Sequence, residues 1–190
     1  MIVESLVTTL DLEGKPNFAP MGVLWGDDEI VLKPYRETAT FRNLCAAGEA
    51  VVNLVDDVRF FVEGALSSPV FPAMPATVVR GVVLEAACSW RELRVRESQT
   101  QEARARFTCD VVHRGFQREF VGYNRARAAV IEATILATRT RILPIEEILA
   151  DYRRLQVVVD KTAGPAEREA MARLNAFVQQ EAEALRGERQ

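Results

Sequence analysis

The segment 33–44, KPYRETATFRNL, brings hydroxyl groups and positive charge together at the expected start of a short helix. Thr38 and Thr40 supply the hydroxyls, and Arg36 and Arg42 supply the charge. The first turn of a helix also has backbone N–H groups without an acceptor inside the helix, at the positive end of the helix dipole. These features together favour a phosphate group, so the segment predicts a site for a phosphate-bearing cofactor.

The same residues have an alternative interpretation that involves no ligand. Thr38 or Thr40 can cap the helix N-terminus through its hydroxyl. Arg36 and Arg42 would then be solvated charges. The rest of the sequence has to decide between the two interpretations.

Few side chains of this sequence are suited to catalysis by the protein itself. No GxGxxG, GxxxxGK[ST] or GxSxG pattern occurs, which argues against a dinucleotide site, a P-loop and a serine hydrolase. His113 is the single histidine, and the three cysteines, Cys45, Cys88 and Cys109, are far apart, so we expect no metal site and three small buried thiols. We therefore expect no catalytic side chain. Redox chemistry carried by an organic cofactor would need only positioning and electrostatics from the protein.

The composition excludes several classes of partner. The 190 residues are 48% hydrophobic and 27% charged, which is ordinary for a soluble globular protein. A net charge of −3 gives no electrostatic argument for nucleic acid or for an anionic membrane. No apolar run approaches a membrane span and no signal peptide is visible, so we expect a cytoplasmic protein that binds neither nucleic acid nor membrane.

The first part of the chain is rich in β-branched residues and alternates in part, as β-strands do. Strands are expected at 2–10, 17–25, 29–33, 50–55, 59–65, 78–89, 91–97 and 104–113. Closely spaced hairpins with one short helix among them favour a small antiparallel barrel, closed or partly closed, over a parallel sheet. The proline-rich segment 67–76 is expected to be a loop, either a lid or subunit contact, or a loop packed on its own barrel.

The periodicity becomes helical from Asn124 onwards. Asn124 can cap a first helix, Pro144 marks the start of a second, and Gly164 precedes a third. The chain is therefore predicted to have an α+β fold. Its two predicted domains are a β-barrel at 1–122 and a C-terminal helical subdomain at 123–190.

Several short stretches, spread over most of the chain, form a recognisable set. They are VESLVTT at 3–9, the turn DxxGKPN at 11–17, NFAPMGV at 17–23, KPYR with TAT at 33–40, AVVN at 50–53, and NRA with VIEA at 124–133. In this order they resemble the FMN-binding split-barrel superfamily, which includes flavin reductases and flavoredoxins. More specifically, the chain looks like a family whose genes tend to accompany tetrahydromethanopterin-linked one-carbon metabolism.

The resemblance implies a split antiparallel β-barrel of the flavin-reductase type with a C-terminal helical extension. It also implies a homodimer with FMN at the subunit interface. The residues that would hold the FMN phosphate are Arg36, Thr38 and Thr40, with Tyr35 and Arg42 as helpers. The residues that would contact the flavin ring or the ribityl chain are Asn17, Ala19, Pro20, Met21, Asn53 and Asp56. Met21 and Asn53 have the alternative of being core and strand-end residues.

Positive charge also precedes the first of the C-terminal helices. His113, Arg114 and Arg125 would receive an anionic substrate, such as a nicotinamide phosphate or the acidic tail of a pterin, unless they form a solvated face. The predicted function is a flavin-dependent oxidoreductase that moves hydride between NAD(P)H and a small acceptor, with a pterin as one candidate. The alternative is a non-catalytic flavin-binding or assembly protein.

Overall fold

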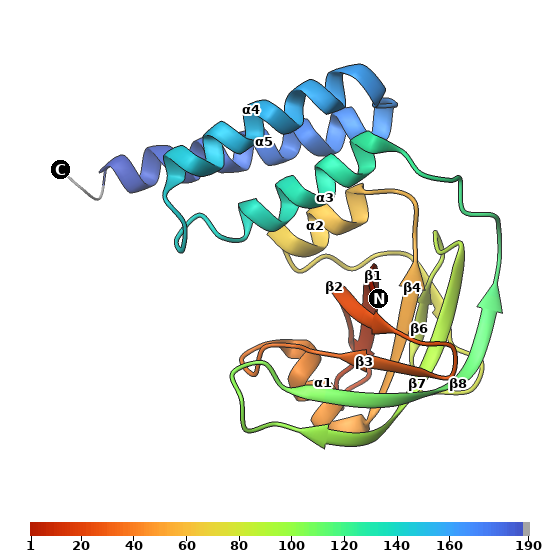
Figure 1. The fold of residues 1–190 in the computed structure, drawn as a ribbon. Helices are drawn as coiled ribbons and strands as arrows, with labels where there is room; N and C mark the ends of the chain where they lie inside the picture. Colours follow the sequence, from red (N-terminus) through yellow and green to blue (C-terminus); the bar gives the residue numbers. More distant parts are fainter. Residues whose placement is uncertain (188–190) are drawn as a thin grey trace. The chain divides into compact units, whose positions relative to one another are not determined.

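The computed structural model describes residues 1–187 and has an α+β fold of two compact units (Figure 1). The barrel unit comprises Met1–Asp56 and Ser68–Phe120, and the helical unit comprises Asp57–Ser67 and Val121–Gln190. This division adds a short internal segment to the C-terminal helices that the sequence predicts as a subdomain. Residues 188–190 of that predicted subdomain lie outside the described range.

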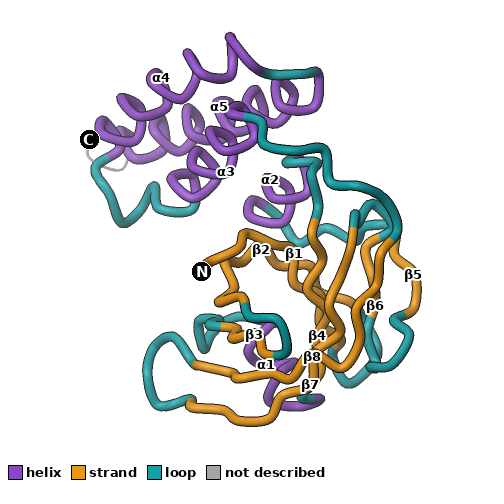
Figure 2. Tube along the Cα trace, turned by 45° about the vertical axis from the view of Figure 1, so that its right-hand side comes forward, coloured by secondary structure: helices purple, strands orange, loops and turns teal. Residues whose placement is uncertain are grey.

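Six antiparallel strands of the described chain close into a barrel in the order β1-β2-β3-β8-β7-β4 (Figure 2). The strands are β1 (Ile2–Leu10), β2 (Pro16–Trp25), β3 (Glu29–Leu32), β4 (Glu49–Leu54), β7 (Ser89–Gln99) and β8 (Arg106–Phe116). Each neighbouring pair is antiparallel, as hairpin connections allow. The predicted α+β fold with an antiparallel barrel is confirmed.

Alternate residues of each strand point into the barrel, and these inward residues are mostly apolar, so the barrel interior is an apolar core. Val7, Val52 and Leu93 are fully buried there, together with residues of the other three strands. Helix α1 (Ala39–Ala47) adds Leu44 to the same core. It lies at the end of the barrel where β1 ends and β2 begins, and we call this end the α1 end.

Helix α1 begins and ends where its sequence allows. Thr38 caps its N-terminus, and Gly48 ends it with a left-handed backbone at φ 66°. That conformation favours glycine because it carries no Cβ. The short helix expected to start within segment 33–44 is therefore confirmed.

One expected strand is a helix. The segment 59–65 forms α2 (Arg59–Leu66), which belongs to the helical unit. Val58, Phe61 and Val62 are buried, and their i, i+3, i+4 spacing places them on one face of a helix. The strand prediction was wrong because a short apolar run with two phenylalanines fits both periods.

A second expected strand is much shorter than its sequence indicates. Of the segment 78–89, the only residues extended within a sheet are β6 (Val82–Leu84) and Ser89, which begins β7. The backbone N–H groups of Val78 and Val79 donate to the carboxylate of Glu92 at 2.6 and 3.0 Å. Because these donors bond a side chain, they cannot join a strand ladder, so the strand starts later.

The proline-rich segment packs on its own barrel. It contains a short strand, β5 (Ala73–Pro75), which pairs with β6 and was not expected. Phe71 packs edge-on against Phe18 of β2, with the ring centroids 5.3 Å apart. Of the two alternatives for this segment, the structure supports the packed loop.

The helical unit also contains three long helices. They are α3 (Arg125–Ala137), α4 (Ile145–Thr162) and α5 (Pro165–Gly187). Asn124 Oδ1 accepts from the N–H of Arg127 at 3.1 Å, so the predicted cap of α3 is confirmed. The predicted starts after Pro144 and Gly164 are confirmed as well. Across residues 1–187, no helix combines the length and the hydropathy that a bilayer span requires.

Candidate functional site

The N-terminus of α1 has the groups that the phosphate prediction requires. Thr38 is extended, with φ −81° and ψ 156°, and its Oγ1 accepts from the N–H of Phe41 at 3.2 Å. The same hydroxyl donates to the carbonyl of Tyr35 at 2.7 Å. The capping interpretation of Thr38 is thus confirmed. The N–H groups of Ala39 and Thr40, at the first two helical positions, have no acceptor within the helix and remain donors for a ligand.

Thr40 faces the protein and not the solvent. Its side chain is buried, and its Oγ1 accepts from Nδ2 of Asn17 at 3.0 Å. A second hydrogen bond of the same kind runs from Asn43 Nδ2 to Thr9 Oγ1 at 3.0 Å. These two bonds fix α1 against the end of β1 and the start of β2. The structure therefore brings Asn17 and Thr40 together, as a support for the first turn of α1.

Three exposed guanidinium groups belong to this region. Arg42 donates from NH1 to the carbonyl of Glu37 at 2.8 Å. The side chain of Arg36 makes no ion pair or hydrogen bond within residues 1–187. Arg104 lies over the ring of Tyr35, with 4.7 Å from its guanidinium carbon to the ring centroid.

Arg104 is a residue that sequence reasoning missed. It lies in the connection between β7 and β8, and an isolated antiparallel bridge joins it to Tyr35. The N–H of Arg36 donates to the carbonyl of Ala103 at 3.2 Å, which holds the two segments together. No local motif marks Arg104, since its position follows from the pairing of distant segments.

The residues predicted along β2 do not share one face. Successive residues on a strand point to opposite sides, so Ala19 and Met21 lie on one face and Pro20 on the other. Met21 packs against the barrel core, and its carbonyl accepts from Ser5 Oγ at 3.0 Å. The core alternative for Met21 therefore has support, and the flavin contacts of all three residues stay predictions.

Asn53 and Asp56 have internal partners. Asn53 is fully buried, its Nδ2 donates to the carbonyl of Leu6 at 2.9 Å, and its Oδ1 accepts from the N–H of Leu84 at 2.9 Å. The side chain of Asp56 is 7% exposed and accepts two hydrogen bonds from Arg118 at 2.6 and 3.1 Å. Both side chains stabilise the barrel unit, and their predicted contacts with the flavin or ribityl chain stay predictions.

The residues predicted to receive a substrate are not one cluster. His113 and Arg114 are neighbours on β8, so their side chains leave opposite faces of the strand. Arg114 donates to the carbonyl of Asp27 at 2.8 Å and to the carboxylate of Asp28 at 2.5 Å. Arg125 is exposed on α3 of the helical unit. Their roles as a joint substrate site stay a prediction.

The three cysteines differ in exposure. Cys88 and Cys109 are buried, and burial raises the pKa of both thiols, that of Cys109 to about 12. At neutral pH these thiols are protonated and poor nucleophiles. Cys45 on α1 is exposed, so the expectation of three buried thiols is wrong for it. Within residues 1–187, no group of histidine, cysteine and acidic side chains could hold a metal ion.

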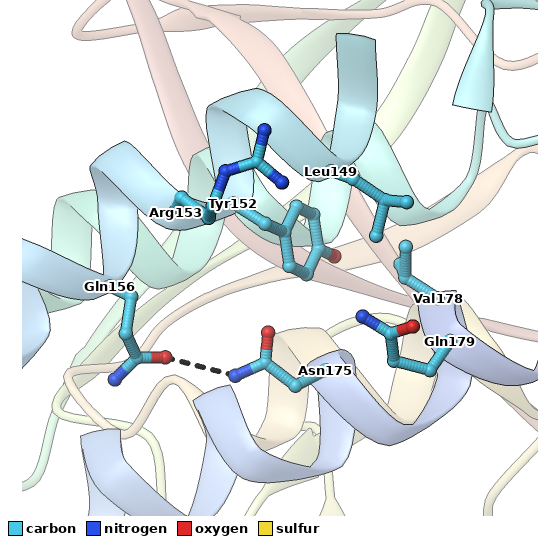
Figure 3. Close-up of a pocket in the computed structure, with 7 residues that line it drawn as sticks. All are labelled: Leu149, Tyr152, Arg153, Gln156, Asn175, Val178 and Gln179. Atoms are coloured by element: carbon cyan, nitrogen blue, oxygen red, sulfur yellow. Dashed lines mark hydrogen bonds between the residues drawn. The ribbon is translucent and has the colours of Figure 1, made fainter. Parts of the chain in front are cut away.

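The helical unit contains a hollow of about 270 Å³ between α4 and α5 (Figure 3). Its lining residues are Leu149, Tyr152, Arg153, Gln156, Asn175, Val178 and Gln179. Asn175 Nδ2 donates to Gln156 Oε1 at 2.9 Å, and the hydroxyl of Tyr152 donates to the carbonyl of Ala133 at 2.6 Å. Much of the polar lining is therefore bonded within the unit. This lining includes none of the residues predicted for flavin or substrate.

Comparison with known proteins now identifies the family. Residues 3–118 match the N-terminal domain of the protein of unknown function DUF447, and residues 124–176 match the second DUF447 region. The chain belongs to the DUF447 family. This family assignment covers most of the sequence and both units of the structure.

Solved structures of other proteins have the same fold. An FMN-bound DUF447 protein from Methanosarcina mazei is similar at a TM-score of 0.81 and 24% identity, over 93% of this chain and 94% of that one. A flavoredoxin from Methanosarcina acetivorans is similar at a TM-score of 0.56 and 15% identity, over 64% of this chain and 72% of that one. A 2-nitrobenzoate 2-nitroreductase from Pseudomonas fluorescens is similar at a TM-score of 0.53 and 21% identity, over 60% of this chain and 64% of that one. The predicted flavin-reductase-like barrel is confirmed at the level of the fold.

Proposed function

We propose that this DUF447 protein binds FMN, with the phosphate at the N-terminus of α1, and is a flavin-dependent oxidoreductase. The observation that carries the proposal is the first turn of α1. There, the side chain of Arg36 makes no hydrogen bond or ion pair within residues 1–187, and the N–H groups of Ala39 and Thr40 have no acceptor in the helix. The protein from Methanosarcina mazei, whose fold matches nearly the whole chain, is FMN-bound.

The donors at α1 suit a single terminal phosphate. Arg36 supplies a guanidinium charge, and the N–H groups of Ala39 and Thr40 supply neutral donors at the positive end of the helix. The Thr38 hydroxyl is already engaged at both its donor and acceptor sides, so it acts by holding the turn in place. Arg42 and the Arg104–Tyr35 pair add positive charge and a flat surface beside the turn. We favour FMN over a dinucleotide because the sequence has no pyrophosphate-binding fingerprint.

The protein side chains of this proposal bind and orient, and none acts as a nucleophile. When bound, FMN supplies the hydride chemistry. Asn17 and Thr40 keep the phosphate end of the site rigid through their mutual hydrogen bond. The buried, protonated thiols of Cys88 and Cys109 take no part. Ring contacts are assigned to Ala19, Pro20 and Met21 on the basis of the sequence resemblance.

Hydride transfer from NAD(P)H to a small acceptor is the proposed reaction, and a pterin is the acceptor that the sequence resemblance favours. The test is an anaerobic mixing experiment in which NADH or NADPH is added to the FMN-loaded protein. Loss of the oxidised flavin absorbance, and its return on addition of an acceptor, is the expected result. If neither nucleotide reduces the bound flavin, the result would contradict the oxidoreductase proposal and favour a non-catalytic flavin-binding protein.

A homodimer with the flavin at the interface is part of the same proposal. Its support is the sequence resemblance together with large exposed apolar side chains in the barrel unit, such as Val70 at 69% and Phe116 at 71%. A second subunit would remove such surface from water. Sedimentation of the FMN-loaded protein should give twice the chain mass of 21.2 kDa, and a monomer mass would contradict the dimer.

A further inference from the structure

A charged side chain closes the barrel at the end opposite α1, which we call the Arg91 end. Arg91 pairs in register with Val52, whose side chain lies in the core, so Arg91 points to the barrel interior. Trp25, at the end of β2, packs against the same core. The guanidinium carbon of Arg91 lies 5.2 Å from the centroid of the Trp25 ring. Because β2 and β7 are not neighbours in the barrel, this contact crosses the interior.

The positive charge of Arg91 lacks a carboxylate partner. Within residues 1–187, no acidic group lies within ion-pair distance of Arg91, and its NH1 donates to the carbonyl of Trp90 at 2.8 Å. Arg114 stands directly opposite on β8, and like charges at opposed positions repel. Burial, then Arg114, lowers the pKa of Arg91, and Asp27 acts in the other direction. The half-buried cation is therefore left without a paired countercharge by the described chain.

The stacking geometry leaves donors available for a ligand. A guanidinium that lies over an indole uses its flat face, and its N–H groups point outward in the plane. One N–H group of Arg91 donates to the carbonyl of Trp90, and its other N–H groups are available to a ligand. Arg114 is about half-exposed and uses NH2 for the carbonyl of Asp27 and the carboxylate of Asp28. Its remaining guanidinium donors, on NH1 and Nε, can add a second donor edge from the neighbouring strand. Two guanidiniums of this kind match the paired oxygens of a carboxylate or phosphate.

We propose that Arg91, Arg114 and Trp25 form an oxyanion site that binds the carboxylate or phosphate group of a small molecule. This site lies at the end of the barrel away from α1, and its existence does not depend on FMN binding. Arg114 belongs both to this site and to the substrate residues expected from the sequence. The other cation of the site is Arg91, and His113 and Arg125 are not part of it. The anion would supply the negative charge that pairs with the Arg91 guanidinium.

The experiment titrates the full-length protein separately with glutarate and with inorganic phosphate, at constant ionic strength. Binding is followed by calorimetry and by the emission of Trp25 in a Trp90→Phe background. We expect saturable binding with a millimolar dissociation constant for at least one anion, and the anion that binds identifies the group. Arg91→Met should weaken binding at least about tenfold, because a charge-assisted pair of hydrogen bonds is lost. The matched control is Arg94→Met, on the same strand with its side chain paired to Glu49.

Three results would overturn the proposal. They are non-saturable binding of both anions, equal affinity of wild type and Arg91→Met, and binding that is lost in Arg36→Met but kept in Arg91→Met. The last result would assign the anion to α1. If Arg91→Met fails to fold, as judged by circular dichroism, the more exposed Arg114→Met takes its place and should weaken binding severalfold. Arg91→Lys should fall between wild type and Arg91→Met, because lysine keeps the charge without the bidentate edge.

Discussion

The two ends of the barrel are closed by different physical means. At the α1 end, Leu44 and Phe41 of the helix complete an apolar core, and the polar groups stand outside it on the first turn. At the Arg91 end, a guanidinium reaches inward and stacks on Trp25. The first arrangement presents backbone donors on a contiguous stretch of sequence, and the second presents side-chain donors from separate strands. The proposed anion site at the α1 end lies on one contiguous segment, so the sequence alone can indicate it. The proposed site at the Arg91 end is assembled from separate strands, so the sequence alone does not indicate it.

The largest expected effect concerns the strand that carries Arg114. A Cβ at Gly115 would meet Cε2 of Trp90 at 1.9 Å, so Gly115→Ala has to displace the indole. Trp90 donates to Glu92, and that bond would be strained as well. We expect a loss of about 3 kcal/mol in the free energy of unfolding, from overpacking. Urea denaturation measures it, with Gly187→Ala as the control because no atom of the described residues lies within 4 Å of a Cβ there.

A smaller effect is expected at the buried carboxylate beside Arg91. Burial alone would raise the pKa of Glu92, but hydrogen bonds from the N–H groups of Thr77, Val78 and Val79 lower it below its usual 4.5. Glu92→Gln should cost about 2 kcal/mol, because backbone donors lose their acceptor. Since the pKa is lowered in the folded state, this stabilisation is present above pH 4.5 and is lost as the pH falls through the folded pKa.

The check for Glu92 is urea denaturation at several pH values. Wild type should lose stability below pH 4.5, and Glu92→Gln should lose less over the same range. Glu97→Gln, an exposed carboxylate on the same strand, serves as the control and should behave as wild type. An identical acid dependence of Glu92→Gln and wild type would contradict the role of this carboxylate.

At the α1 end, the buried hydroxyl of Thr40 should matter next. Thr40→Val keeps the shape but removes the acceptor of the Asn17 amide. We expect a loss of about 1.5 kcal/mol in unfolding free energy. FMN affinity should fall at the same time, because the first turn of α1 loses a support. A variant with unchanged stability would mean that water replaces the hydroxyl without cost.

The smallest effect is expected at the helix cap. Thr38→Ala removes the acceptor for the N–H of Phe41 and should cost about 1 kcal/mol in thermal or urea unfolding. Thr38→Ser keeps the capping oxygen and is the control. If Thr38→Ala and Thr38→Ser are equally stable, the hydroxyl does not hold the turn.

Much of the fold could be predicted because its signals are local. The strand of 2–10 is rich in β-branched residues and partly alternating, Asn124 caps a helix, and Pro144 and Gly164 mark helix starts. These features depend on neighbours within a few residues. The phosphate segment was visible for the same reason, since Arg36 and Thr38 lie only two positions apart in sequence.

The features that sequence reasoning missed depend on distant pairings. The short apolar run of α2 fits both the helix period and the strand period, and its helical form is stabilised by packing against the core of the helical unit. Arg104 meets Tyr35 through a bridge between remote segments, and Arg91 meets Trp25 across the barrel interior. No residue near them in sequence indicates these contacts. Strand order and register are needed before either can be seen.

The most direct test of the account is an FMN titration of the flavin-free protein, followed by quenching of flavin fluorescence. We predict saturable binding, weakened about ten- to a hundredfold by Arg36→Met, because a charge-assisted hydrogen bond contributes roughly 1.5–3 kcal/mol. Arg154→Met removes another exposed positive charge, from α4, and should leave the affinity unchanged. Absence of saturable FMN binding by the folded wild-type protein, or equal affinity of wild type and Arg36→Met, would contradict the proposed phosphate site at α1.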